Sequence, residues 1–285
     1  MNPSSATASL LEMKAAVEAG LDRLLAGESR LFEALRYAVL TGGKRFRPLL
    51  LLSAGEAFGG DRATLLPYAC AVELIHSYSL VHDDLPCMDD DAVRRGKPSC
   101  HRAFGEAPAL LAGDALLTLA FEVLAGAPSG AAGAGRKDRA VGTMAEAAGA
   151  RGMIAGQWMD IEYDRGRADE ASLVELMALK TGALILASVR AGALMGGAPD
   201  SGLQDVERYG REVGLAFQLR DDLLDAGKKA EGRSGTRPNA AALFGPEWTK
   251  ARLRRAVGGA LEALDAAGVQ SAELQALVSG LDDID

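Results

Sequence analysis

The sequence contains little cysteine, few aromatic residues and no excess of positive charge. Three cysteines, Cys70, Cys87 and Cys100, occur among 285 residues, an odd number without the paired spacing of metal-binding motifs. A disulfide framework is therefore not expected, and reduced thiols favour a cytoplasmic location. The net charge of −8 supplies no basic surface, so we expect no nucleic-acid partner. Any site for phosphate groups must then be built locally.

Signals for export and for membrane insertion are also lacking. The N-terminal stretch has no basic region followed by an apolar run and a cleavage site, so no signal peptide is predicted. The apolar stretch that begins at Thr181 meets a charge at Arg190, well short of the ~18 residues that a membrane span needs. With 48% hydrophobic and 25% charged residues, the composition is typical of a globular protein. We expect a soluble protein without a membrane span.

Helical periodicity dominates the sequence, and two-residue alternation is rare. Helices are expected near residues 65–82, 110–125, 137–160, 203–225 and 247–267. Pro48 is placed to open a further helix, and Ser172 with Glu175 has the spacing of a capping box. Glycine-rich or polar stretches from Gly126 and Ala226 are expected to be loops inside one domain. The prediction is an all-α, single-domain bundle of long helices over residues 1–285.

Aspartates are concentrated in two places. Five of them fall within the nine residues 83–91, which taken alone would be explained by a solvated acidic turn. A second group ends the stretch FQLRDDLLD, where Gln218, Asp222 and Asp225 share one helical stripe and Asp221 lies beside it. Oxygen ligands suit Mg²⁺, which would offset the repulsion between the carboxylates. The candidate metal ligands are Asp83, Asp84, Asp89, Asp221, Asp222 and Asp225.

Basic residues stand close to the first acidic group in the sequence and before a predicted helix. GGKRFRP places Lys44, Arg45 and Arg47 where a helix N-terminus also favours anions, and Arg94 and Arg95 follow the aspartates directly. Arginine forks match phosphate oxygens. A lone GGKR is a surface turn in most proteins, but beside a metal pair it indicates a second phosphate site. The pattern therefore predicts two phosphorylated substrates.

Five motifs together resemble those of a known family. GGKRFRP, LVHDDLPCMDDDAVRRG, GQWMDIE, LKTGAL and GLAFQLRDDLLD occur in this order within about residues 30–245. They are similar to the motifs of trans-isoprenyl diphosphate synthases, above all the bacterial short-chain group that includes farnesyl diphosphate synthase. The resemblance implies helices around a deep central cavity and usually a homodimer. It also implies Mg²⁺-dependent joining of isopentenyl diphosphate to an allylic diphosphate.

The resemblance also implies roles for individual residues. The two aspartate motifs would hold Mg²⁺ against the allylic diphosphate, with Arg94 and Lys180 as cationic contacts. Lys180, Thr181 and Gln218 would act at the reacting carbon, and Gln157 and Asp160 would line the same cavity. The isopentenyl diphosphate site would comprise Gly43, Lys44, Arg47, His76 and Arg95, with Gln218 and Lys180 also facing substrate.

Product length depends, by the same resemblance, on Tyr78, the fifth residue before the first aspartate. Its ring would stop growth at farnesyl diphosphate, with geranylgeranyl diphosphate as the alternative, whereas position alone is equally compatible with a packed core tyrosine.

After Asp225 the sequence departs from the family, because the segment is shorter and lacks the usual Gly-Asp. Lys228 or Arg237 could supply a cation there. A terpene cyclase or a weakly active subunit of a heteromeric synthase stays open, although two phosphate sites and two intact aspartate motifs argue against both.

Overall fold

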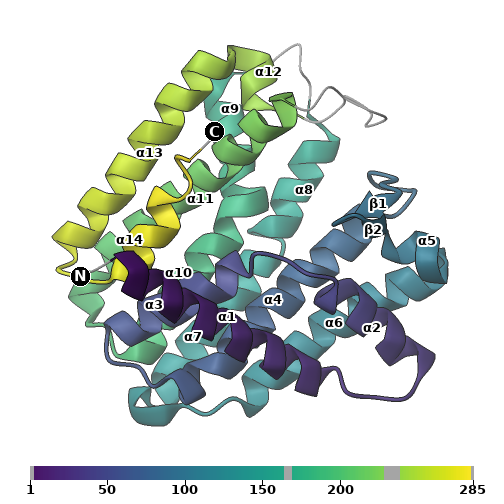
Figure 1. The fold of residues 1–285 in the computed structure, drawn as a ribbon, viewed down its shortest axis with the longest axis horizontal. Coiled ribbons are helices and arrows are strands. Elements are labelled where there is room, and N and C mark those ends of the chain that lie inside the picture. The colour runs from purple at the N-terminus through teal and green to yellow at the C-terminus, as the bar shows by residue number, and fades with distance from the viewer. Residues whose placement is uncertain (1–2, 164–168, 228–237, 284–285) are drawn as a thin grey trace.

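The computed structural model describes residues 3–163, 169–227 and 238–283, and most of them are helical (Figure 1). The predicted all-α class is confirmed. In the N-terminal half the helices are α1 (Pro3–Leu24), α2 (Arg30–Leu40), α3 (Phe46–Ala57), α4 (Arg62–Asp83), α5 (Cys100–Phe104), α6 (Glu106–Gly126) and α7 (Ala134–Ala148). In the C-terminal half they are α8 (Met153–Ile161), α9 (Glu170–Met177), α10 (Ala183–Gly196), α11 (Leu203–Gly227), α12 (Ala240–Phe244), α13 (Pro246–Ala266) and α14 (Ala272–Ser279). A π-helical turn, η3 (Ala178–Gly182), joins α9 to α10, and 3₁₀ turns lie at η1 (Gly130–Ala132) and η4 (Asp200–Gly202).

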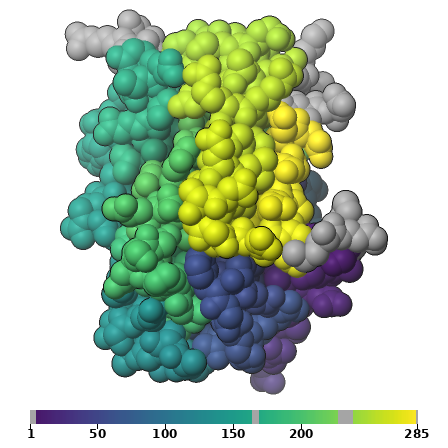
Figure 2. Space-filling model, turned by 90° about the vertical axis from the view of Figure 1, so that its left-hand side faces the viewer, coloured from purple at the N-terminus to yellow at the C-terminus, as the bar shows by residue number. Residues whose placement is uncertain are grey.

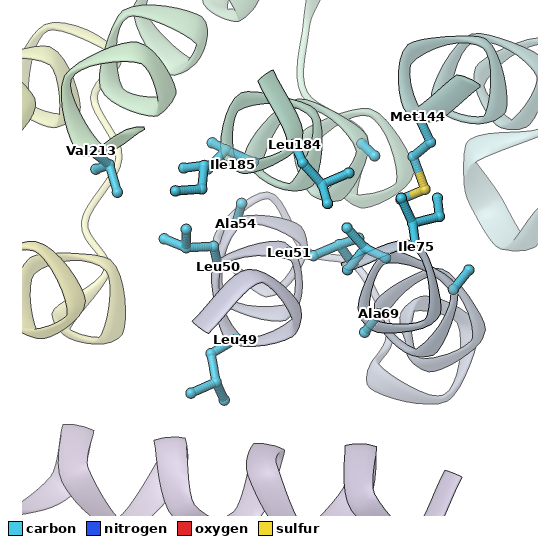
Figure 3. Packing of buried hydrophobic residues seen from close by; sticks show 14 of the residues in the cluster. Leu49, Leu50, Leu51, Ala54, Ala69, Ile75, Met144, Leu184, Ile185 and Val213 are labelled. Atoms are coloured by element: carbon cyan, nitrogen blue, oxygen red, sulfur yellow. The ribbon is translucent and has the colours of Figure 1, made fainter. Parts of the chain in front are cut away.

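The centre of the bundle is the contact between α3 and α10. Four consecutive leucines of α3, Leu49 to Leu52, are buried, as expected for a helix covered on all sides. Figure 3 shows Leu50 and Leu51 facing Ile185 and Leu184 of α10. Glycine allows this approach, because a Cβ at Gly192 would lie 2.2 Å from the carbonyl oxygen of Leu51. The central helices are therefore closely packed and form a rigid support for the elements around them.

The other helices surround this pair. α4 packs against α3 and α6, α7 packs against α10, and α11 lies between α10 and α13. Figure 2 shows α13 and α14, in yellow, covering one face of the molecule beside α11, in green. The apolar stripe predicted from Leu203 is confirmed in α11, where Val206, Tyr209 and Val213 are buried. The long helices α4 and α11 thus run through the bundle, and both carry an aspartate group at the C-terminal end.

Several local predictions were wrong in detail. The helix predicted over 137–160 is two helices, α7 and α8, because the chain turns at Gly152, where a Cβ would lie 2.2 Å from the carbonyl oxygen of Ala147. Pro48 is the third residue of α3 rather than the first. The capping box of α9 pairs Asp169 with Ser172 instead of Ser172 with Glu175. Polar residues close in sequence compete for one cap, and spacing alone does not select between them.

A short hairpin was not predicted. β1 (Val93–Arg94) pairs with β2 (Lys97–Pro98), with Arg94 opposite Lys97. Arg95 and Gly96 form its two-residue turn with φ of +54° and +76°, as a hairpin turn of this length requires. The hairpin follows the first aspartate group, and it sets the direction in which Arg94 and Arg95 leave the backbone.

Two helical runs among the described residues, Glu106–Gly126 and Glu170–Gly196, are long and apolar enough to cross a membrane by length and composition. In the first, 33% of the most apolar window is buried inside the protein, and in the second 50%. Core helices of soluble proteins pass the same test. The absence of a membrane span therefore stays a prediction.

Candidate active site

A cavity of about 810 Å³ opens between α4, α8, η3 and α11. Its volume lies in the range of small-molecule sites. The predicted site residues that line it are Arg47, His76, Tyr78, Asp83, Arg94, Gln157, Asp160, Lys180, Thr181, Gln218, Asp221, Asp222 and Asp225. The predicted residues that do not line it are Gly43, Lys44, Asp84, Asp89 and Arg95. Residues far apart in the sequence are thus brought to one hollow, whose remaining wall is largely apolar.

The two aspartate groups meet at this cavity. Asp83 is the last residue of α4, and Asp221, Asp222 and Asp225 belong to the last turns of α11. Burial raises the pKa of Asp221, and the nearby Asp225 charge adds to this. Burial also raises the pKa of Asp222 to about 6, against hydrogen bonds from the Ala240 amide and Gln218 that favour the charged form. Partly desolvated carboxylates of this kind are stabilised by a cation.

The oxygens of Asp222 are fixed by neighbours on both sides. Gln218 donates through Nε2 to Oδ1 at 2.9 Å, and the backbone amide of Ala240 donates to Oδ2 at 2.7 Å. The side-chain amide of Gln218 lies one turn earlier in α11, and the backbone amide of Ala240 belongs to the first residue of α12. Asp222 therefore ties α12 to the metal end of α11 and holds a fixed orientation.

Asp84 has a different environment from the one predicted. Its side chain is 2% exposed and receives Nε of Arg94 at 3.0 Å, with a second close contact from Nη2. Arg94 also binds Asp91 at 3.0 Å, so Asp91 is not the solvated turn residue expected from the sequence. The prediction that Asp84 faces the metal cavity is thus not supported by its position. Asp84 instead holds Arg94, whose side chain does line the cavity.

The turn after α4 brings Asp89 back toward Asp83, as the sequence predicts. The Asp89 amide donates to the carbonyl oxygen of Asp83 at 2.9 Å. Asp90 follows with φ of +49° and is paired on the surface with Arg102. The turn therefore keeps the aspartate motif compact, although Asp89 itself lies outside the cavity wall.

The donor set of the cavity fits Mg²⁺. All of its acidic ligands are carboxylates, which this hard ion prefers. Within residues 3–163, 169–227 and 238–283, no three His, Cys, Asp or Glu side chains already form a metal-binding group. Mg²⁺ binds through one or two carboxylates together with water and substrate phosphates. The open arrangement of Asp83 opposite α11 matches that mode better than a closed protein cage.

The cationic side of the cavity is built around Arg47. Its guanidinium lies 5.7 Å from the centre of the Phe217 ring, and its buried Nε has no hydrogen-bond partner among the described residues. Burial lowers its pKa to about 10, which still leaves it charged at neutral pH. Burial, with Arg47 and Arg95 nearby, lowers the pKa of His76 well below its usual value, so His76 is neutral. An unsatisfied, desolvated guanidinium is suited to an incoming phosphate.

The GGKRFRP loop reaches the hairpin through Arg95. Arg95 donates through Nη1 to the carbonyl oxygen of Gly42, and Gly43 adopts φ of +143°. A Cβ at Gly43 would lie 3.1 Å from the Arg95 guanidinium, so glycine is needed for this contact. Lys44 is exposed beside it, and its charge acts on Asp221. Gly43, Lys44 and Arg95 therefore lie together outside the cavity wall, with Lys44 close enough for its charge to act on Asp221 of the cavity.

Sequence reasoning missed the pair formed by Arg45 and Glu73. Arg45 has φ of +54° and donates through Nη1 to Glu73 at 2.6 Å and through Nη2 to the carbonyl oxygen of Val39 at 2.8 Å. Both side chains are at most 2% exposed. Arg45 therefore anchors the loop instead of facing substrate. The available signal was Glu73, a lone acid in the apolar stretch ACAVELI.

Of the residues predicted to act at the reacting carbon, Lys180 and Thr181 lie on the π-helical turn and Gln218 lies on α11. Thr181 donates through Oγ1 to Oε1 of Gln218 at 2.6 Å, and Lys180 forms an ion pair with Asp160. A Cβ at Gly156 of α8 would lie 2.2 Å from the Lys180 amide nitrogen, so α8 presses directly on the turn. π-Turns interrupt α-helices frequently at functional sites.

Tyr78, the residue predicted to limit product length, lines the cavity. The side chain is buried, and its hydroxyl donates to the carbonyl oxygen of Ala148 at 3.5 Å. Its ring meets the imidazole of His82 edge-on at 5.8 Å, and Nε2 of His82 lies 2.9 Å from the carbonyl oxygen of Leu110. Tyr78 of α4 thus lines the cavity and contacts the end of α7, and its role as the floor stays a prediction. Lys228 and Arg237 lie outside the described residues.

Comparison with known proteins identifies the family. The polyprenyl synthetase family matches residues 28–235. The chain belongs to this family. It is 47% identical over 219 residues to the farnesyl diphosphate synthase of Geobacillus stearothermophilus, covering 76% of this chain and 74% of that protein. These similarities support trans-prenyl synthase activity.

Other relatives differ in the product that their names state. The chain is 47% identical over 206 residues to the large subunit 1 of a heterodimeric geranylgeranyl pyrophosphate synthase of Arabidopsis thaliana, covering 71% of this chain but 56% of that protein. In structure it is similar to an FPP/GFPP synthase from Zymomonas mobilis, with a TM-score of 0.86, 34% identity, and coverage of 97% and 98% of the two chains. The family is therefore established, and the product length is not.

Proposed function

We propose that the protein is a Mg²⁺-dependent short-chain prenyltransferase that condenses isopentenyl diphosphate with dimethylallyl or geranyl diphosphate to give farnesyl diphosphate. The observation that carries the proposal is one cavity lined both by aspartates of α4 and α11 and by the cationic Arg47 with His76. One diphosphate fits the acidic, metal-binding side, and a second fits the cationic side. A protein that binds one phosphorylated molecule would need only the acidic, metal-binding residues.

In the proposed reaction the residues of the cavity bind the diphosphate, orient the substrate and exclude water. When bound, Mg²⁺ neutralises the leaving diphosphate and so favours ionisation of the allylic C–O bond. Asp83 and the α11 aspartates hold the ion, while Arg94 and Lys180 contact the diphosphate oxygens. The linked oxygens of Thr181 and Gln218 face the developing carbocation as fixed dipoles. The largely apolar wall excludes water from the cation.

Isopentenyl diphosphate is oriented by the cationic side. Arg47, with Lys44 and Arg95 nearby, binds its diphosphate and directs its double bond toward the allylic carbon. His76 is neutral and therefore binds rather than carries a proton. After the new carbon–carbon bond forms, a proton leaves, and the released diphosphate accepts it. This assignment follows the family resemblance, and it needs no side-chain base.

Farnesyl diphosphate is favoured as the product by the position of Tyr78. The ring lines the cavity and is held by contacts with Ala148 of α7 and with His82, and in the proposal it forms the floor that a longer chain would have to displace. Geranylgeranyl diphosphate is the second candidate, because relatives that make it by name are as similar as the bacterial farnesyl synthase. A terpene cyclase is disfavoured by the second phosphate site.

A homodimer in the cytoplasm completes the proposal. α6 is strongly apolar, yet Leu110 and Leu111 are exposed, and Trp158 and Ile161 of α8 are exposed as well. Leu110, Trp158 and Ile161 also line the cavity, so Leu111 is the one of these four that is exposed outside it. A second copy of the chain is the partner that the family resemblance implies. The three free cysteines suit a reducing compartment.

The test is an incubation of the purified protein with Mg²⁺, radiolabelled isopentenyl diphosphate and geranyl diphosphate, followed by chromatography of the products. We expect farnesyl diphosphate, loss of nearly all of it in Asp83→Ala, and longer products in Tyr78→Ala. Tyr37→Phe, which alters a tyrosine outside the cavity, serves as the control and should leave the product unchanged. Cyclic hydrocarbons, or no turnover without a second protein, would overturn the proposal.

A further inference from the structure

A second cavity, of about 570 Å³, lies behind the π-helical turn. Along the same helical run, Met177, Lys180 and Thr181 face the first cavity, whereas Ala178 and Gly182 line the second. One five-residue turn thus separates two hollows. The second is bounded by α7, α10, α11 and α13 and shares no lining residue with the first.

The floor of the second cavity is apolar and built from small side chains. Ala178, Gly182, Ala183 and Ala187 leave the space unfilled, and Leu186 and Leu215 add apolar surface. A hollow with such a floor favours a hydrocarbon group, since burial of apolar surface is favourable by about 25 cal/mol per Å². Its volume suits a small molecule rather than a folded partner.

The rim of the same cavity has an unbalanced pair of cations. Arg190 and Arg211 both pair with one acid, Glu207, at 3.3 and 3.6 Å. The Nε of Arg190 is buried and has no hydrogen-bond partner in the described part of the chain. The lining also contains Glu212 and Arg252 and the ion pair of Arg151 with Glu146, so four arginines and three glutamates line the cavity, and the unpaired Nε of Arg190 is a donor kept for another anion. A phosphate group, with three acceptor oxygens, matches two forks.

We propose that this cavity binds a small amphiphilic anion, a short alkyl or prenyl chain with one phosphate group. The phosphate lies between Arg190 and Arg211, and the chain lies over the small residues of η3 and α10. The chemical class of this ligand follows from the combination of an apolar floor and a rim with more arginines than glutamates. Neither inorganic phosphate nor an uncharged alcohol would use both.

A ligand bound in this cavity affects the proposed active site through η3. This step rests on the proposed function. Gly182 lines the second cavity and follows Thr181 directly. The turn has little free space on its other sides, since Gly156 touches Lys180 and a Cβ at Gly214 would lie 2.8 Å from Gly182. A ligand that presses on Gly182 therefore displaces Thr181 and its hydrogen bond to Gln218. The ligand acts as an effector of the prenyl transfer step.

The binding test uses octyl phosphate, titrated calorimetrically into the whole protein without Mg²⁺. We expect Arg190→Gln and Arg211→Gln to weaken binding by about tenfold each, the loss of one charge-assisted contact. Glu207→Gln should tighten binding, because it frees both forks. A general structural defect would weaken binding in all three variants, so the opposite sign of Glu207→Gln separates the two explanations.

Two control variants test which of the two cavities octyl phosphate occupies. Arg254→Gln alters an exposed arginine of α13 outside the cavity and should have no effect, and Arg47→Gln, in the first cavity, should have none on this binding event. If Arg47→Gln abolishes binding and Arg190→Gln does not, octyl phosphate occupies the first cavity and the proposal is wrong. Equal affinity for inorganic phosphate, or for octanol, would also overturn it.

The coupling is measured by hydrogen exchange, which needs no catalysis. Octyl phosphate should slow amide exchange in residues 178–182 of the wild type but not of Arg190→Gln. In the prenyl transfer assay it should change kcat in the wild type only. Protection of η3 in a protein without prenyl transfer would reject the proposed function and keep the site. Activity without protection or binding would reject the site and keep the function.

Discussion

Replacing Glu73 tests whether a buried ion pair sets the shape of the GGKRFRP loop. The Glu73 carboxylate lies 2.6 Å from Nη1 of Arg45, and both side chains are at most 2% exposed. Removing Glu73 leaves the buried Arg45 with the partly exposed Glu18, 3.5 Å from its Nε, as the remaining acidic partner. Loss of one partner of a buried ion pair costs about 3–5 kcal/mol. Glu73→Gln keeps an amide oxygen as acceptor, so we expect a loss of stability at the lower end, about 3 kcal/mol. Glu73→Ala should lower the free energy of unfolding by about 5 kcal/mol, the upper end of that range.

The same change should weaken isopentenyl diphosphate binding. Arg45 holds a left-handed backbone conformation, which is unfavourable for a non-glycine residue by about 1–2 kcal/mol and persists because its side chain is fixed. Without that anchor the loop from Gly42 to Arg47 has more than one conformation. The expected result is a raised KM for isopentenyl diphosphate with a smaller change in the KM for the allylic substrate.

The assay combines urea unfolding, followed by circular dichroism, with steady-state kinetics. Asp22→Asn provides the matched control, because Asp22 and Arg36 form an ion pair at 2.7 Å on the surface and should contribute at most about 1 kcal/mol. The double variant Arg45→Met/Glu73→Met should recover stability without recovering KM, since an apolar pair can replace a buried ionic one. A loss below about 1 kcal/mol in Glu73→Gln would refute the reasoning.

Two further predictions concern other elements. Gly156→Ala should lower the free energy of unfolding by about 1–3 kcal/mol and reduce kcat, because the new Cβ would meet the Lys180 amide at 2.2 Å. Thermal unfolding checks this against Gly142→Ala, where the Cβ meets nothing within 4 Å and stability should rise by about 0.5–1 kcal/mol. Iodoacetamide should modify the exposed Cys87 well before Cys70 and Cys100, since burial raises the pKa of those thiols to about 12 and about 11. Peptide mass spectrometry reads the order, and early labelling of Cys70 would contradict it.

The meeting of the two aspartate groups was predictable because it depends on helix periodicity. Asp222 and Asp225 share a stripe with Gln218, and that stripe faces the cavity as the 100° spacing requires. Asp83 follows from the same rule applied to α4. Such predictions need only that a helix forms and that one face is buried, and both conditions are visible in the apolar pattern of α11.

The direction of Asp84 was not predictable in this way. It lies at the C-terminal end of α4, where helical spacing no longer fixes orientation, and its partner Arg94 arrives from an unpredicted hairpin. Arg45 and Glu73 present a similar difficulty, because their contact joins a loop to a helix across tertiary structure. Local sequence shows that a buried charge needs a partner, but it does not show which one.

The π-helical turn explains how one helical run serves two cavities. A π-turn contains one more residue than an α-turn, so it changes the rotational phase of α10 relative to α9. Leu173, Leu176 and Met177 of α9 face the first cavity and Val174 of α9 faces the second, whereas Ala183, Leu186 and Ala187 of α10 all face the second. Thr181 and Gly182 lie at the change of phase and face opposite ways. Because the two residues are consecutive in the chain, a displacement of either one moves the other. Gly156 of α8 and Gly214 of α11 let their helices approach this turn closely, so it has little room to absorb such a displacement elsewhere.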